Sequence, residues 1–189
     1  LVLDESAAGD PAVDGYFAAL ADRVCSGLDA AGFPRCPGGV MAVNPDWRRT
    51  SSEWARQVTD WVRVPGADVV LRAQVFFDIR AVHGDASLLA RVRREMLERP
   101  ADSPRFLAHL ARVACDWHPP LGFFRGLVVA RRGEYRNTLD IKAGGLNPVV
   151  QIARIHALTA GLEEVSTLDR LDAAAGAGVI ARADAEDLA

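Results

Sequence analysis

This sequence has few of the features that mark membrane proteins, zinc proteins or nucleic-acid binders. No apolar run approaches the roughly 20 residues that a membrane-spanning helix requires, so we expect no membrane partner. The chain has three cysteines, which cannot all pair and which lack the close doublets of a zinc site. Unpaired cysteines favour a reduced, cytoplasmic setting. A formal net charge of −3 argues against a nucleic-acid partner, because general nucleic-acid binders are markedly basic.

Apolar residues, by contrast, are plentiful. Half of the 189 residues are hydrophobic, which is enough for one well-packed domain or for two small ones. The chain does not begin with methionine, residues 1–4 have the pattern of a strand end, and residues 183–189 have that of the first turns of a helix. We therefore expect a piece of a longer protein that contains part of its active site.

The first half of the chain mixes helical and extended patterns. Asp10 before Pro11 predicts a helix start, and apolar residues at helical spacing continue to a stop at Gly32. The segment from Thr50 to Glu53 is a capping box that predicts a second helix, which Pro65-Gly66 ends. The Gly- and Pro-rich stretch between the two predicts a loop.

The pattern becomes mainly helical near residue 100. Before that point, aromatic and β-branched residues over 74–82 predict a buried strand, and a helix is expected over 87–98. Beyond it, helix starts are predicted at Ser103-Pro104, Asn147-Pro148 and Ser166-Thr167. The predicted fold class is therefore α+β, with a partial α/β domain over 1–100 and an all-α bundle over 101–189.

Asp78 stands out because it lies inside the apolar run over 74–82. Removing a carboxylate from water costs several kcal/mol unless a partner charge or a metal ion compensates. Two interpretations follow. Arg80, two residues on and therefore on the same face of a strand, neutralises Asp78, or Asp78 binds a divalent cation together with other carboxylates.

A second group of candidate residues lies in the loop before the capping box. Gly38 and Gly39 are adjacent there, and paired glycines let a backbone approach a ligand closely. Asn44 and Arg48 follow in the same loop. The loop lacks the Lys-Ser/Thr of a P-loop, so the alternative is a tight turn with Trp47 packed beneath it.

Lys142 is a third candidate. Asp140 and Lys142 share a face if the backbone is extended, and they either pair with each other or leave Lys142 to meet a phosphate. Arg154, on the helix that follows, either joins Lys142 or makes a salt bridge on the helix face.

Several of these segments together resemble one bacterial family. They are Gly38 to Ala42 with Asn44-Pro45 and Trp47-Arg48, Phe76 to Arg80, Pro119 to Phe124, Asp140 to Lys142, Asn147 to Val150 with Ala153-Arg154, and Thr167 to Leu171. In this order they are similar to the nucleotidyltransferases of bacterial signal-transduction proteins, which often carry cyclic-nucleotide-binding and CBS domains. The likeness covers nearly the whole chain.

The resemblance implies a polymerase-β-like fold, here a partial nucleotidyltransferase sheet with helices, followed by a helical substrate-binding domain. It implies a Gly-Ser turn and three strand carboxylates that hold two Mg²⁺ ions around a nucleoside triphosphate. Asp78 matches the third carboxylate, which makes it the implied metal ligand and catalytic residue. The implied nucleotide-binding residues are Gly38, Gly39, Asn44, Arg48, Lys142 and Arg154. The Gly-Ser turn and the other carboxylates are not found in this sequence, so the chain as given is not expected to catalyse transfer.

The expected function is therefore that of a nucleotidyltransferase fragment, which moves a nucleoside monophosphate from an NTP to an acceptor that the sequence does not identify. Regulatory domains of the same parent chain are the expected partners, and a homodimer is compatible with the sequence. The alternative is a non-catalytic module that binds a nucleotide, or that passes a signal from attached sensor domains to a partner.

Overall fold

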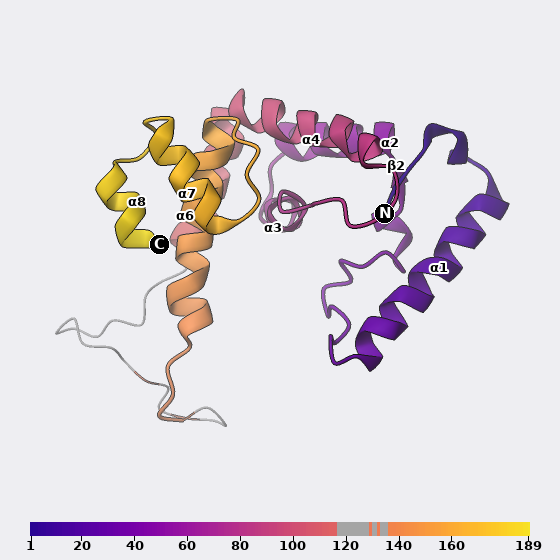
Figure 1. Cartoon of the computed structure of the whole chain (residues 1–189), viewed down its shortest axis with the longest axis horizontal. Helices are drawn as coiled ribbons and strands as arrows, with labels where there is room; N and C mark the ends of the chain where they lie inside the picture. The colour runs from indigo at the N-terminus through magenta and orange to yellow at the C-terminus, as the bar shows by residue number, and fades with distance from the viewer. Residues whose placement is uncertain (117–128, 130–131, 133–135) are drawn as a thin grey trace. The chain divides into compact units, whose positions relative to one another are not determined.

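The computed structural model describes residues 1–116, 129, 132 and 136–189 (Figure 1). Their helices are α1 (Pro11–Ala30), α2 (Ser51–Arg63), α3 (Ala67–Phe76), α4 (Ala86–Ala101), α5 (Pro104–Cys115), α6 (Asn147–Thr159), α7 (Thr167–Gly176) and α8 (Arg182–Leu188). The strands are β1 (Val2–Leu3) and β2 (Arg49–Thr50). The α+β class is confirmed, with helices dominant. Among the described helices, none is long and apolar enough to cross a membrane.

The chain divides into two compact units, and neither is continuous in sequence. The first contains Leu1–Trp61 and Arg80–Met96, and the second contains Val62–Ile79 and Leu97–Ala189. The predicted division at residue 100 therefore differs from the observed one, because residues 62–79, with α3, belong to the second unit. Apolar contacts join α3 to the rest of the second unit: α3 packs on α5, and the ring of Phe77 meets that of Phe106 edge-on at 6.0 Å.

In the first unit, β1 and β2 pair in parallel and bring residues 1–3 to the start of α2. The predicted capping box is present there: the Thr50 amide donates to Glu53 Oε2 at 2.9 Å, and the Glu53 amide donates to Thr50 Oγ1 at 3.3 Å. Trp54 is buried on α2, and its indole nitrogen donates to the Leu1 carbonyl. Its ring packs on that of Trp47, 5.7 Å away, so Trp47 contacts α2.

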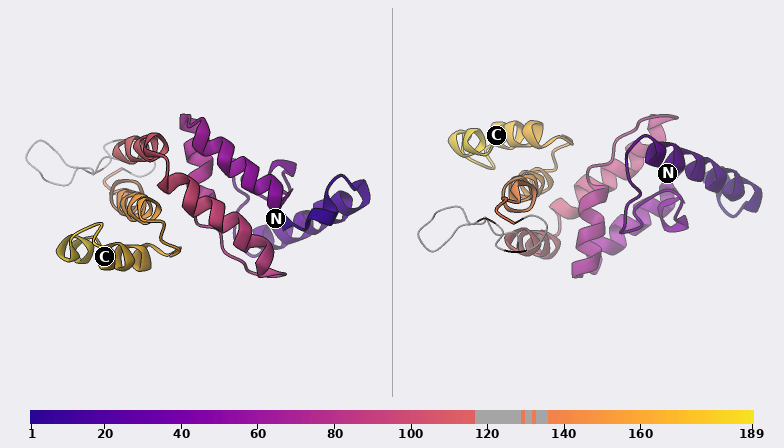
Figure 2. Two further views of the ribbon diagram at one scale, coloured as in Figure 1. Left: turned by 90° about the horizontal axis from the view of Figure 1, so that it is seen from above. Right: turned by 90° about the horizontal axis from the view of Figure 1, so that it is seen from below.

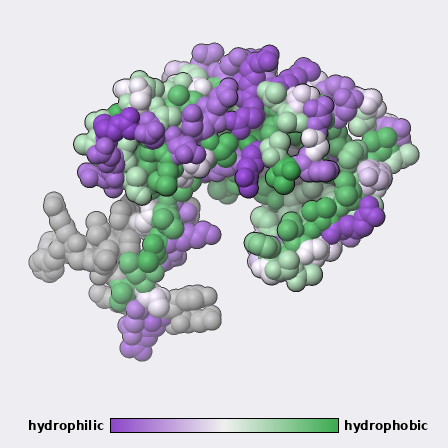
Figure 3. Space-filling view, viewed as in Figure 1, coloured by the Kyte–Doolittle hydropathy of each residue, from purple (hydrophilic) through white to green (hydrophobic). Residues whose placement is uncertain are grey.

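Helix α1 begins as predicted, because the Asp10 carboxylate accepts hydrogen bonds from the amides of Ala12 and Val13. The residues that α1 buries differ from those of the expected apolar face. Ala21 and Cys25 are buried, whereas Val24 and Leu28 are exposed. Figure 3 shows apolar side chains over this part of the surface.

The second unit is built around α6, which lies between α5 and α7 in both views of Figure 2. Small residues allow the close approach of α6 and α7: Ala153 and Ala157 on α6 and Ala174 on α7 are all buried. Leu171 and Ala185, from α7 and α8, extend this core. The bundle predicted for the C-terminal half is therefore present in the described residues of that half.

The predicted strand over 74–82 is wrong. The chain is helical to Phe76, turns at Phe77 and Asp78, and has no regular structure over 79–82. Val70, Ala73, Gln74 and Phe77 are all buried, and their spacing of three, four and seven residues is that of one helix face. Burial of that face against α5 outweighed the β-propensity of the Val-Phe-Phe sequence.

Candidate functional site

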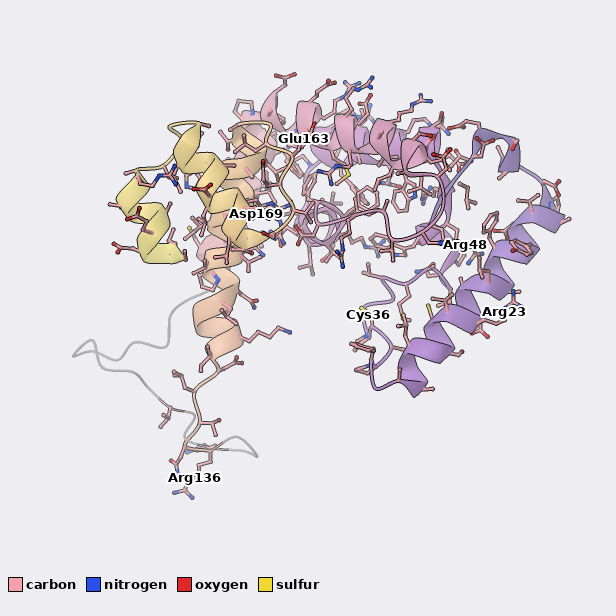
Figure 4. The ribbon with its side chains drawn as sticks, viewed as in Figure 1. Arg23, Cys36, Arg48, Arg136, Glu163 and Asp169 are labelled. Carbon is pink, nitrogen blue, oxygen red and sulfur yellow. The ribbon has the colours of Figure 1, made fainter. Side chains whose placement is uncertain are left out.

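Three elements of the second unit bring charged side chains together around Asp78. Asp78 lies in the turn that ends α3, where its amide approaches the Val75 carbonyl at 3.4 Å. Arg154 lies in the middle of α6, and Arg170 lies in the first turn of α7. The N-cap of α7 is Ser166, whose hydroxyl accepts a hydrogen bond from the Asp169 amide (Asp169 is labelled in Figure 4). This cap fixes the start of α7 and therefore the position of Arg170 in its first turn.

Both arginines bind the Asp78 carboxylate. Arg154 donates from Nε to Oδ1 at 3.3 Å and from Nη2 to Oδ2 at 2.5 Å, which is a two-point contact. Arg170 donates from Nη1 to Oδ1 at 2.7 Å. Charge-assisted pairs of this kind are among the stronger hydrogen bonds in proteins.

Arg170 also binds the backbone on both sides of the site. Its Nε donates to the Glu164 carbonyl at 2.8 Å, and its Nη2 donates to the Phe77 carbonyl at 3.2 Å. One guanidinium therefore ties the segment before α7 to the turn after α3.

The network continues from Arg154 into the core through two amides. Arg154 Nη1 donates to Gln151 Oε1 at 2.9 Å, and Gln151 Nε2 donates to Gln74 Oε1 at 3.1 Å. Within the part of the chain that the structure describes, Gln74 Nε2 and Glu164 Oε2 are buried without a hydrogen-bond partner. A buried polar group without a partner costs about 1–3 kcal/mol of stability.

The three charged side chains differ in their exposure to solvent. The side chains of Arg154 and Arg170 are 6% and 4% exposed, whereas that of Asp78 is 38% exposed. The guanidinium groups are therefore desolvated, and the carboxylate is the part of the cluster that reaches water. Buried charges of this kind depend strongly on their partners.

The pairing of Asp78 with Arg80 is wrong. That interpretation required a strand, in which residues 78 and 80 share a face, and the observed turn removes this condition. Arg80 is exposed, and the neutralising charges come instead from Arg154 and Arg170.

The surroundings of Asp78 do not fit the Mg²⁺ ligand that the resemblance implies. Both of its oxygens accept guanidinium N–H groups, and two positive charges beside it repel a divalent cation. Among the described residues there is no group of three His, Cys, Asp or Glu side chains that could hold a metal ion.

Two family models match the chain. Residues 1–68 match the family described as "Putative nucleotidyltransferase DUF294", and residues 104–189 match the one described as "Putative nucleotidyltransferase substrate binding domain". Together they cover most of the sequence. The chain is therefore similar to these two families over most of its length. No curated protein and no solved structure gives a significant match to it.

The two matched ranges contain only part of the charged cluster. Arg154 and Arg170 lie within the range that matches the substrate-binding domain, whereas Asp78 lies between the two matched ranges. The carboxylate thus comes from the segment that connects the two parts of the family pattern.

Of the predicted nucleotide-binding residues of the loop, which lie in the first matched range, Asn44 binds the loop backbone, and Arg48 binds the loop backbone and helix α1. Gly39 has a positive φ of 67°, and its carbonyl accepts from the Asn44 side chain at 3.2 Å. Arg48, labelled beside α1 in Figure 4, donates to the Ala42 carbonyl at 2.9 Å and pairs with Asp14. Gly38 and Gly39 therefore stand in a tight turn, and the described contacts of Asn44 and Arg48 stabilise it.

Lys142 belongs to the second unit. It is exposed at the start of a π-helical turn over Lys142–Leu146. The backbone is not extended there, so the expected alternation that would place Asp140 and Lys142 on one face does not apply. The segment from Pro119 to Phe124, which contributes to the family resemblance, lies outside the described residues.

Sequence reasoning missed Arg170, Gln151 and Gln74 as members of the site. Each is a polar residue at a buried position of a helix. Arg170 precedes the buried Leu171, and Gln151 lies one turn before Arg154 on α6. For Gln151 and Arg170, a polar residue on the inward face of a predicted helix was the available signal, since such residues require partners. Gln74 lay in the segment predicted to be a strand, so this signal did not apply to it.

Proposed function

We propose that this chain binds a phosphate-bearing substrate of nucleotidyl transfer, and that Arg154 and Arg170 contact its phosphate groups. In the whole protein the reaction would move a nucleoside monophosphate from an NTP to an acceptor. The observation that carries the proposal is the convergence of two buried guanidinium groups on one solvent-facing position. Both arginines lie in the range that matches a substrate-binding domain.

The chemistry of the arginine pair supports this role. A guanidinium presents planar, parallel N–H donors that match the oxygens of a phosphate, and it stays charged at any physiological pH. Burial of both groups reduces solvent screening, so an anion placed between them is held more strongly than one at an exposed arginine. The other hydrogen bonds of Arg170, to the Glu164 and Phe77 carbonyls, hold its guanidinium in place before a ligand arrives.

The proposal concerns substrate binding and assigns no step to a metal ion, because the described carboxylates do not fit one. A second candidate is a non-catalytic module that binds a nucleotide, or that passes a signal from attached sensor domains to a partner. The engagement of Asp78 by two arginines favours this candidate, since it leaves that carboxylate without the geometry of a metal ligand.

The test is a titration of ATP, GTP, CTP and UTP into the protein by calorimetry. We expect binding of at least one nucleotide, and a Kd that rises about thirtyfold or more in Arg154→Gln, since truncating a buried charged partner costs about 2 kcal/mol or more. Arg182→Gln is the matched control, because Arg182 forms an exposed pair with Asp172 in the same unit.

Equal affinities of wild type and Arg154→Gln, with both proteins folded by circular dichroism, would reject the arginine pair as the phosphate site. A separate assay, the release of pyrophosphate by the whole protein, distinguishes the transferase from the regulatory module. Nucleotide binding without turnover supports the regulatory module, and turnover supports the transferase.

A further inference from the structure

We infer that the Asp78 carboxylate is a displaceable occupant of the arginine pair, and that a phosphate group of the substrate takes its place on binding. This inference rests on the proposed function and adds a competition between the chain and its ligand. Asp78 would then act as a latch, which holds the arginines in position while the site is empty and leaves when the substrate arrives.

The first observation concerns the hydrogen bonds. The Asp78 oxygens accept three N–H groups from Arg154 and Arg170. These are the donors that a phosphate oxygen would need, and a carboxylate and a phosphate use a guanidinium in the same two-point manner. The two anions therefore cannot both occupy the pair, and binding of one requires the other to withdraw.

The second observation is the contrast in exposure within the cluster. The guanidinium groups are buried, and the carboxylate that joins them is partly open to water. An incoming anion thus approaches from the side on which Asp78 lies. Asp78 also regains solvent when it leaves, which lowers the cost of breaking its ion pairs.

The third observation is the backbone around Asp78. It lies beyond the last residue of α3, and the hydrogen bond that its amide donates to the Val75 carbonyl is long at 3.4 Å. The chain has no regular structure over 79–82. The side chain can therefore withdraw without breaking a helix or a strand. The chain passes from the second unit to the first immediately afterwards, between Ile79 and Arg80, so displacement would alter the segment that connects them.

A latch makes a prediction opposite to that of a metal ligand. If Asp78 competes with the ligand, the observed Kd contains the cost of displacing it, and its neutralisation tightens binding. If Asp78 instead binds the ligand through a cation, neutralisation weakens binding.

The experiment titrates inorganic tripolyphosphate, without divalent cations, into wild type, Asp78→Asn and Asp14→Asn. Asp14 is the matched control, because it is an exposed acid that pairs with a buried guanidinium: the Arg48 side chain is 5% exposed. Asp14→Asn also changes the net charge by the same amount as Asp78→Asn. We expect Asp78→Asn to lower the Kd about tenfold, the size of an ordinary conformational competition. Asp14→Asn should leave the Kd within about twofold of wild type, since surface charges contribute little.

An unchanged or higher Kd in Asp78→Asn, an equal gain in Asp14→Asn, or no tripolyphosphate binding by any of the three proteins would overturn the latch. None of these results decides the proposed function, which depends on the separate titration of nucleotides into wild type and Arg154→Gln.

Amide hydrogen exchange on the wild type covers the case in which Asp78→Asn does not fold. The Ile79 amide donates to the Phe76 carbonyl at 3.1 Å in the turn that carries Asp78. Displacement should speed the exchange of the Asp78 and Ile79 amides when tripolyphosphate is added. Unchanged or slower exchange under saturating ligand would overturn the inference.

Discussion

Arg170 donates a 2.7 Å hydrogen bond to Asp78 across 92 positions of the sequence. The same guanidinium donates to the carbonyl of Phe77, the neighbour of Asp78 in the turn. Arg170 therefore fixes both the side chain and the backbone at the end of α3. It connects a helix of the C-terminal half to a segment that sequence alone assigned to the other domain.

This role predicts a large stability loss on truncation of Arg170. Arg170→Ala should lower the free energy of unfolding by about 3 kcal/mol or more, because it breaks a buried charge network and leaves partners unsatisfied. Arg182→Ala removes an exposed pair with Asp172 and should cost less than about 1 kcal/mol. Urea denaturation of both variants provides the measurement. Similar losses in the two would show that the buried network has no special weight.

The cap of α7 has a smaller, separable effect. The Ser166 hydroxyl accepts from the Asp169 amide at 3.2 Å and donates to the Asp169 carboxylate at 2.6 Å. Ser166→Ala should therefore cost about 1 kcal/mol in urea denaturation, as for other lost N-caps. Ser166→Thr keeps the hydroxyl and should retain most of the stability. If Ser166→Ala leaves the free energy of unfolding unchanged, the capping role is contradicted.

The two adjacent glycines of the loop should respond differently to the same change. Gly39 has a positive φ, so Gly39→Ala should lower the free energy of unfolding by about 1–2 kcal/mol, although its Cβ would meet no atom closer than 3.7 Å. Gly38→Ala places its Cβ at an ordinary 3.8 Å from Cys36 Sγ and should be nearly neutral. Thermal unfolding measures both. If both variants instead keep their stability and weaken nucleotide binding, the loop is a ligand site.

Glu5 should make the stability of the first unit depend on acid pH. Hydrogen bonds from Ser52 and Ser51 at the start of α2 lower the pKa of Glu5 to about 2, from an ordinary value of 4.5. A carboxyl group with a lowered pKa contributes stability that is complete above its unfolded-state value and is lost as the pH falls through the folded-state value. The Glu5 contribution should therefore decline between pH 4.5 and about 2.

Glu5→Gln removes this titration and keeps the shape of the side chain. Its free energy of unfolding should lie below that of wild type at pH 7, and the difference should shrink toward pH 2. Equilibrium denaturation at several pH values tests this expectation. A difference that does not change between pH 7 and pH 2 would contradict it.

Local chemistry made the helix starts predictable. Asp10, Thr50, Ser103 and Ser166 all cap the helices for which the sequence marked them, because a cap needs only a side-chain oxygen and the next few amides. Each cap contact joins residues close in sequence, and only at the start of α2 does a distant residue, Glu5, add described hydrogen bonds. The α+β class and the helical C-terminal half follow from the same signals.

The surroundings of Asp78 were not predictable in the same way. The apolar run of residues 74–82 has strong β-propensity, and its helical spacing becomes visible only when Val70 and Ala73 are included. The partners Arg154 and Arg170 are 76 and 92 positions away, so no local pattern reveals them. The sequence did show that Asp78 needed compensation, and it named Arg154 for a different role.

The discontinuity of the two units has a practical consequence for protein engineering. A shortened protein that starts at residue 101 would lose α3, uncover the ring of Phe106, and deprive Arg154 and Arg170 of the Asp78 carboxylate. Such a piece should be poorly soluble or unfolded. Because Arg80–Met96 interrupts the second unit in sequence, a self-sufficient version of that unit should contain Val62–Ile79 as well as Leu97–Ala189.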